Sequence, residues 1–224
     1  MDLLTQMSLH KRTTPAIMAS ILRHHFDNMA DGTQLTLNMI TKAVKAKLLH
    51  YNKTSDQLVI RFDIDRHVQD EIDKFQYPLP MVVKPRKVTN NMKNGYLTSS
   101  GSLLLRKNHH DEDICLDHIN RVNKIRFVIN QDTALMIKNK WKNLDKPKTG
   151  ESSDDYKKRV KAFEKYDRTA KQVIDTICRY SDDFYLTHKY DKRGRVYCQG
   201  YHVNYQGNPW NKAVIELADK ELIP

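Results

Sequence analysis

The stretch that decides the fold is residues 154–180, which read DDYKKRVKAFEKYDRTAKQVIDTICRY. Apolar side chains recur there at three- and four-residue spacing, the pattern of one face of an amphipathic helix. They are Tyr156, Val160, Phe163, Ala170, Ile174 and Ile177. The polar turn before them, residues 147–153, offers Ser152 or Ser153 as an N-cap. We therefore expect a long helix over this stretch.

A second helix is expected just upstream, over residues 117–141. Its apolar side is marked by Val122, Ile125, Val128, Ile129, Met136 and Trp141. Two helices joined by a short polar turn pack antiparallel, so the pair predicts a helical hairpin. Between Val122 and Tyr180, 15 Lys and Arg residues face 8 Asp and Glu residues, which is +7 of the net +11. Such a hairpin could lie along a phosphate backbone, or it could be an ordinary solvated helical face.

The remaining pattern is mixed. Thr14 and Pro15 read as the N-cap and first position of a helix that stops near residues 31–32. A second amphipathic stretch follows over residues 35–48, and alternation over residues 58–64 predicts a strand. Residues 77–101, with their prolines, asparagines and glycines, predict an irregular connection. Residues 191–210 predict short antiparallel strands, and residues 211–222 a last helix.

Composition narrows the class of protein. The chain has 224 residues, 29% of them charged, and a pI near 9.4, which favours a polyanionic partner. No apolar run reaches the ~20 residues of a membrane span, and residues 1–11 lack the apolar core of a signal peptide. Three scattered cysteines suit a reducing compartment. One metal-capable cluster, His109, His110, Cys115 and His118, fits no zinc module and is better explained as a polar loop with one buried thiol.

The segment KYDKRGRVY, residues 189–197, carries the most specific signal. It closely resembles the T/D-x-x-G-R motif, followed by V-Y, of single-subunit RNA polymerases of the phage and mitochondrial type. Residues 204–208, NYQGN, resemble the N-P-Q-G-N segment of that family, with Tyr205 in place of proline. Lys212 stands where the family has a lysine opening a helix. Fainter similarity upstream, at residues 83–85, 94–96 and 129–134, extends the resemblance over residues 79–224.

The resemblance implies an α+β, mainly α fold in three parts. Residues 1–116 would be a helical N-terminal region, residues 117–188 a basic helical-hairpin thumb, and residues 189–224 the first antiparallel strands and helix of an incomplete palm. The family's metal-binding aspartates, and the nucleotide-binding residues of its fingers, would lie beyond Pro224. No catalytic or metal-binding residue is therefore expected in this chain.

The same resemblance implies a function and a set of partners. Some short-tailed phages of the schitovirus type split this polymerase into two chains, and the smaller chain looks like this one. It would hold template DNA and the RNA–DNA hybrid through residues that the motifs and the basic helix supply: Arg193, Gly194, Arg195, Gln206, Lys212, Lys158, Lys161, Lys165, Arg168 and Lys171. A larger subunit would bind Mg²⁺ through its aspartates and handle nucleoside triphosphates. A phage DNA-binding activator is a further expected partner, a membrane is not, and the expected location is the cytoplasm of the infected bacterial host.

Two other readings stay open. A stand-alone basic nucleic-acid-binding protein would use the same helices without a dedicated partner. A nuclease would use His109, His110, Asp111 and Asp113, and would cleave in a metal-dependent way.

Overall fold

The computed structural model describes residues 2–220, and the chain divides into two compact units, Met1–Ile72 and Asp73–Pro224. Both contain helices and small antiparallel sheets, which confirms the α+β class with helix predominating. Among the described residues, none of the helices has the length and apolar character needed to cross a bilayer.

The first unit is a small layer of helices over a three-stranded sheet of order β1-β3-β2. Its elements are α1 (Asp2–His10), β1 (Arg12–Thr13), α2 (Pro15–Leu22), the short 3-10 helix η1 (Arg23–His25), α3 (Met29–Lys45), β2 (Leu49–Asn52), β3 (Gln57–Ile60) and the start of α4 (Arg66–Phe75). The predicted cap is confirmed, because the Thr14 side chain accepts a hydrogen bond from the N–H of Ile17 at 3.2 Å. Met7, Met18 and Leu58 are fully buried between the layers.

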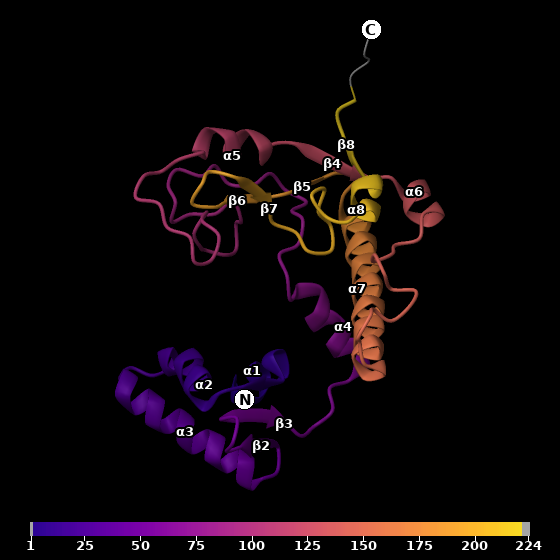
Figure 1. The fold of residues 1–224 in the computed structure, drawn as a ribbon. Helices are drawn as coiled ribbons and strands as arrows, with labels where there is room; N and C mark the ends of the chain where they lie inside the picture. The colour runs from indigo at the N-terminus through magenta and orange to yellow at the C-terminus, as the bar shows by residue number, and fades with distance from the viewer. Residues whose placement is uncertain (1, 221–224) are drawn as a thin grey trace. The chain divides into compact units, whose positions relative to one another are not determined.

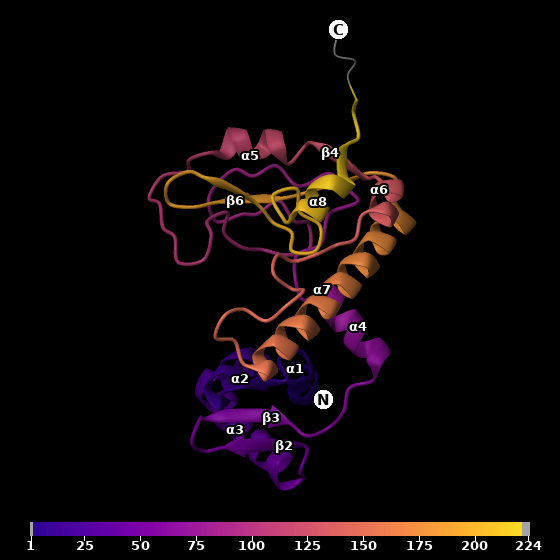
Figure 2. The same ribbon diagram turned by 45° about the vertical axis from the view of Figure 1, so that its right-hand side comes forward.

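The second unit begins with the end of α4. An irregular run follows, as predicted for residues 77–101, and the next helix starts at Leu116. They are α5 (Leu116–Val122), β4 (Arg126–Ile129), α6 (Gln131–Met136), α7 (Ser153–Tyr180), β5 (Phe184–Tyr185), β6 (His188–Tyr190), β7 (Val196–Cys198), α8 (Pro209–Val214) and β8 (Ile215–Leu217). In Figures 1 and 2, α6 lies beside the C-terminal end of the long helix α7, and α8 packs against the middle of α7, where Nδ2 of Asn211 donates to the hydroxyl of Tyr166 at 2.9 Å.

Helix α7 confirms the prediction for residues 154–180, and Ser152 is its N-cap, accepting from the N–H of Asp155 at 3.1 Å. The helix predicted over residues 117–141 is wrong. Residues 126–129 form β4 instead, the centre of a sheet of order β5-β4-β8. The β-branched and aromatic run Arg126–Ile129 suits a pleated surface better than a helix, and tertiary pairing decides the outcome. Among the described residues α7 therefore has no long helical partner, and the predicted hairpin is wrong as well.

The last helix is also shorter than predicted for residues 211–222. It ends at Val214, and the chain passes directly into β8, whose Ile215 pairs with Ile129 of β4. The end of that prediction, residues 221–222, lies outside the described residues. Of the strands predicted over residues 191–210, the structure has β7 alone, paired with β6.

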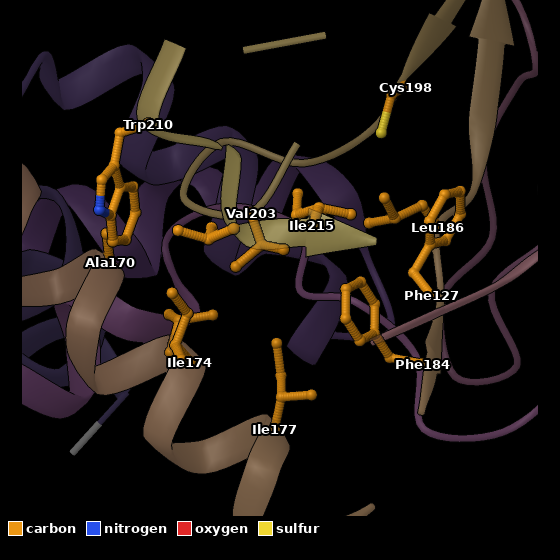
Figure 3. Close-up of a cluster of buried hydrophobic side chains, with 12 residues drawn as sticks. Phe127, Ala170, Ile174, Ile177, Phe184, Leu186, Cys198, Val203, Trp210 and Ile215 are labelled. Carbon is orange, nitrogen blue, oxygen red and sulfur yellow. The ribbon is translucent and has the colours of Figure 1, made fainter. Parts of the chain in front are cut away.

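The core of the second unit lies between α7, the β5-β4-β8 sheet and the loop before α8. Figure 3 shows Ile174 and Ile177 of α7 pointing toward Val203, Ile215 and Phe184. Phe184 is fully buried, and Trp210 is 4% exposed. Leu186, just before β6, and Cys198, the last residue of β7, belong to the same core, so this packing anchors the open end of the hairpin formed by β6 and β7.

Candidate nucleic-acid interface

The turn between β6 and β7 is organised by one buried carboxylate, that of Asp191. Its Oδ1 accepts the backbone N–H groups of Arg193, at 2.9 Å, and of Arg195, at 3.1 Å. The turn is closed by the N–H of Gly194, which donates to the carbonyl of Asp191 at 2.9 Å. Gly194 has φ +79°, a left-handed conformation that glycine adopts without strain. The sequence therefore needs both an acceptor at Asp191 and a glycine at Gly194 to make this turn.

The other carboxylate oxygen of Asp191 holds the arginine side chains. Its Oδ2 accepts from Nε of Arg195 at 2.7 Å and lies 2.6 Å from Nη2 of the same residue. Nε of Arg193 is 3.6 Å away. Burial raises the pKa of Asp191, but the hydrogen bonds from Arg195 and the backbone outweigh it and bring the pKa to about 2. Arg195 is thus paired with Asp191, yet its side chain stays 54% exposed and that of Arg193 65%.

The pairing fixes the direction of the Arg195 guanidinium rather than hiding it. Only one edge of the fork faces the carboxylate, and the group also lies over the Tyr197 ring, 5.9 Å from its centroid. Within residues 2–220, Nη1 of Arg195 has no hydrogen-bond partner. A guanidinium held in this way keeps donors that can bind phosphate oxygens bidentately.

The turn rests on the segment that precedes α5. The Cys115 thiol donates to the carbonyl of Gly194 at 3.5 Å, and the N–H of Lys192 donates to Oδ1 of Asn108 at 3.0 Å. A Cβ at Gly194 would lie 3.4 Å from Sγ of Cys115, an ordinary contact. Burial raises the pKa of the Cys115 thiol, which keeps it protonated at neutral pH. Two hydrogen bonds, which span 79 and 84 positions of the sequence, therefore fix the turn of the hairpin to the segment before α5.

The metal-capable cluster of the sequence does not assemble. His109 pairs with Asp111 at 2.9 Å, and both side chains are more than 80% exposed. His110 contacts the carbonyl of Glu112 through Nδ1 at 3.0 Å. Over the described part of the chain, no three His, Cys, Asp or Glu side chains converge in a way that could hold a metal ion.

Lys189 was missed by sequence reasoning. It lies on β6 directly across from Tyr197 of β7, so the two side chains share one face of the hairpin. Burial lowers the pKa of its ammonium group, and among the described residues no carboxylate pairs with it. The signal was available, because Lys189 opens the quoted motif two residues before Asp191. The hairpin therefore presents Lys189 as well as the two arginines.

The two downstream motif residues have different environments. Gln206 uses its side-chain amide within the fold: Oε1 accepts from the N–H of Cys198 at 2.8 Å, and Nε2 donates to the carbonyl of Val196 at 3.3 Å. It therefore clamps the following loop onto β7. Lys212 lies exposed on α8, whose N-cap is Asn208.

All five cations predicted along α7 are exposed, and acidic side chains pair with several of them. Lys165 pairs with buried Asp73 at 2.8 Å, Lys171 with Asp167 at 2.7 Å, and Lys158 with Asp155 at 3.2 Å. Lys161 and Arg168 are exposed. The acidic partners reduce the net charge that this face of α7 offers to a phosphate backbone.

A buried histidine links the hairpin to its surroundings. His188 of β6 is 1% exposed; its Nδ1 lies 2.8 Å from Oδ1 of Asn123, and its Nε2 lies 2.8 Å from the hydroxyl of Tyr205. Burial lowers the pKa of His188 to about 4 and raises that of Tyr205 to about 12. At neutral pH the imidazole is therefore neutral, and it joins β6 to the end of α5 and to the loop before α8.

Comparisons with known proteins give one consistent description. No family model matches the chain. A protein from Agaricus bitorquis named "Probable DNA-directed RNA polymerase" is 28% identical over 171 residues, which cover 65% of this chain and 15% of the relative. One of the same name from Gelasinospora sp. (strain G114) is 27% identical over 155 residues, covering 65% of this chain and 17% of the relative. The chain thus spans about a sixth of the length of these relatives.

Proposed function

We propose that this chain is one subunit of a split, single-subunit-type DNA-directed RNA polymerase of phage origin. It would hold template DNA and the RNA–DNA hybrid, while a larger partner chain provides the catalytic palm and fingers. The observation that carries the proposal is the Asp191 turn, which projects two half-exposed guanidinium groups from one tight, anchored loop. The similarity to two proteins named as RNA polymerases supports the same role.

The chemistry divides between the chains. Mg²⁺ held by the partner's aspartates would stabilise the attacking and leaving oxygens of nucleotide transfer. This chain's task is positioning. Arg195, oriented by Asp191, and Arg193 beside it would grip backbone phosphates next to the growing RNA end, and Lys189 on the same hairpin would add a third positive charge. Contacts of this kind hold a strand in register without reading its sequence.

Unpaired surface in the second unit supports a partner chain. Strand β8 lies at the edge of its sheet, and among the described strands only β4 pairs with it. Leu217 of β8 is 54% exposed, and Leu135 and Met136 of α6 are 86% and 83% exposed. An open strand edge and strongly exposed apolar side chains are typical of a surface that another chain covers. We expect a heterodimer interface of more than roughly 2,000 Å².

The partner is tested first. The chain and the product of a neighbouring reading frame that encodes palm and fingers are purified together and separately, and their masses are measured by light scattering after size exclusion. We expect a one-to-one complex, RNA synthesis by the complex with Mg²⁺, and none by either chain alone. A monomer that binds nucleic acid and ignores the larger chain would favour the stand-alone basic binding protein instead.

The turn is tested in that complex with Arg195→Ala and Arg195→Lys. Both should leave the heterodimer intact and lower extension of a preformed RNA–DNA scaffold by roughly ten- to a hundredfold. Arg121 is a matched control, because it too forms an i,i+4 pair with an aspartate, Asp117, at 2.9 Å. Arg121→Ala should extend normally. Equal extension rates for the Arg195 variants and the wild type would leave Arg195 with a purely structural role in the turn.

A further inference from the structure

The second unit contains an aromatic cavity that the proposed function does not yet use. Its volume is about 250 Å³, and four segments distant in the sequence line it: the residues after α4, the loop after α6, the middle of α7 and the loop after β7. Its ring-bearing residues are Tyr77, Trp141, Tyr166, Tyr201 and His202. The volume is below the roughly 300–1,000 Å³ of pockets for drug-sized ligands, so it suits a single planar ring system.

The aromatic rings that line the cavity become more buried from its mouth to its inner end. Tyr77 and Tyr201 stack with centroids 4.0 Å apart and are 37% and 42% exposed, so they line the mouth. Tyr166 is 7% exposed and meets Tyr201 edge-on at 5.3 Å, while Trp141 lies 5.5 Å from Tyr166. A flat ring entering here would meet aromatic faces and edges on several sides.

Polar groups without partners lie in this aromatic lining. His202 is 5% exposed, and neither of its ring nitrogens has a hydrogen-bond partner among the described residues. Thr169, 1% exposed and part of the same lining, also has a hydroxyl without a partner there. Buried polar groups are almost always hydrogen-bonded, so two such groups beside one cavity point to a ligand that completes them when the lining side chains turn to expose these atoms.

The charges of the cavity exclude some ligands. Burial lowers the pKa of His202 to about 4, so at neutral pH the imidazole offers one donor and one acceptor rather than a positive charge. Lys165 at the rim is paired with Asp73 at 2.8 Å, which cancels its charge toward a phosphate. The cavity therefore favours an uncharged, flat ring whose edge both donates and accepts hydrogen bonds.

We propose that the aromatic cavity binds a nucleobase. The choice of a nucleobase over other planar rings rests on the proposed function. A base stacks on the aromatic rings, and its amide-like edge pairs with His202 and Thr169. Lys161 is exposed one turn before Lys165 on the same side of α7, where it can meet the phosphate attached to a base held in the cavity. The base comes either from a single strand passing over α7 or from a free nucleotide.

The test uses the full chain and 2-aminopurine, whose fluorescence is quenched by stacking. It is offered in two forms: a single-stranded oligonucleotide with one central 2-aminopurine, and the free 2-aminopurine nucleoside. We expect saturable quenching by the wild type. Tyr201→Ala should weaken it about five- to a hundredfold, the range for loss of one stacking ring. His202→Phe keeps the ring and removes both nitrogens, and should weaken it about three- to tenfold.

Tyr180→Ala is the matched control, because Tyr180 is an exposed aromatic residue at the end of α7 and outside the cavity lining. It should bind both probes as the wild type does. Tighter binding of the oligonucleotide than of the nucleoside assigns the cavity to a strand, and equal binding assigns it to a free nucleotide. Absence of quenching by the wild type, or equal quenching by the wild type, Tyr201→Ala and His202→Phe, overturns the proposal. RNA extension by the complex is measured in parallel. Normal extension together with absent nucleobase binding would leave the proposed function standing and remove only the cavity proposal.

Discussion

Replacing His188 by glutamine should remove part of the acid sensitivity of the second unit. His188 is 1% exposed, and burial lowers its pKa from the ordinary value of 6.5 to about 4. Between these two values the unfolded chain binds a proton that the folded chain does not. Stability therefore falls as the pH falls from 6.5 toward 4, and it is at its full value above 6.5.

The size of the effect follows from the two pKa values. At pH 7.5 both states are almost entirely neutral at this residue. At pH 5.0 the unfolded state is protonated and the folded state largely is not, which lowers the free energy of unfolding by about 2 kcal/mol. Glutamine can still contact Asn123 and Tyr205 but does not titrate, so the His188→Gln protein should lose about 2 kcal/mol less than the wild type between these pH values.

The assay is urea unfolding at pH 7.5 and pH 5.0, followed by tryptophan fluorescence. Both tryptophans, Trp141 and Trp210, belong to the second unit, so the signal reports that unit. His202, whose pKa is also about 4, lowers the free energy of unfolding over the same pH range in both proteins. Its contribution therefore cancels when the two proteins are compared. His109→Gln, at a ring 84% exposed, should behave as the wild type. Identical pH dependence in the wild type and His188→Gln would refute the reasoning.

Three further predictions concern the turn and helix α7. Gly194→Ala places a side chain at φ +79° and should destabilise the unit by about 1 kcal/mol in thermal unfolding, since the added Cβ meets no closer contact than 3.4 Å. The double change Lys157→Gln and Lys161→Gln should lower the salt slope of nucleic-acid binding by about 1.4–1.8. Lys171→Gln, at a lysine already paired with an aspartate, should change that slope less. Ser152→Ala removes the N-cap of α7 and should cost about 1 kcal/mol in urea unfolding.

Local signals predicted two helix starts and the apolar face of the longest helix. The N-caps at Thr14 and Ser152, and the apolar period of α7, are properties of short sequence windows, and the structure confirms them. The same reasoning failed for residues 117–141. The apolar residues there fit either a helix face or a strand, and pairing of β4 with segments far along the chain selects the strand.

The candidate site was predictable in composition but not in its internal contacts. The Asp191 turn and its arginines follow from the quoted motif. That Asp191 would organise the turn through two backbone N–H groups, and that acids would pair with Lys165 and Lys171, depends on side-chain positions in three dimensions. The aromatic cavity was also missed, because its walls come from four segments whose proximity no sequence window contains.

The order of strands in the β5-β4-β8 sheet has a consequence for synthesis of the chain. The middle strand, β4, is made first, and β5 follows it only after the whole of α7. The second neighbour, β8, begins at Ile215, about 85 residues after β4 ends at Ile129. At roughly 5–20 residues per second, a ribosome needs about 4–17 seconds to synthesise the residues between β4 and β8. During this interval β4 has open backbone groups on at least one side, so the nascent chain depends on the early, local folding of α7 to keep that strand from pairing elsewhere.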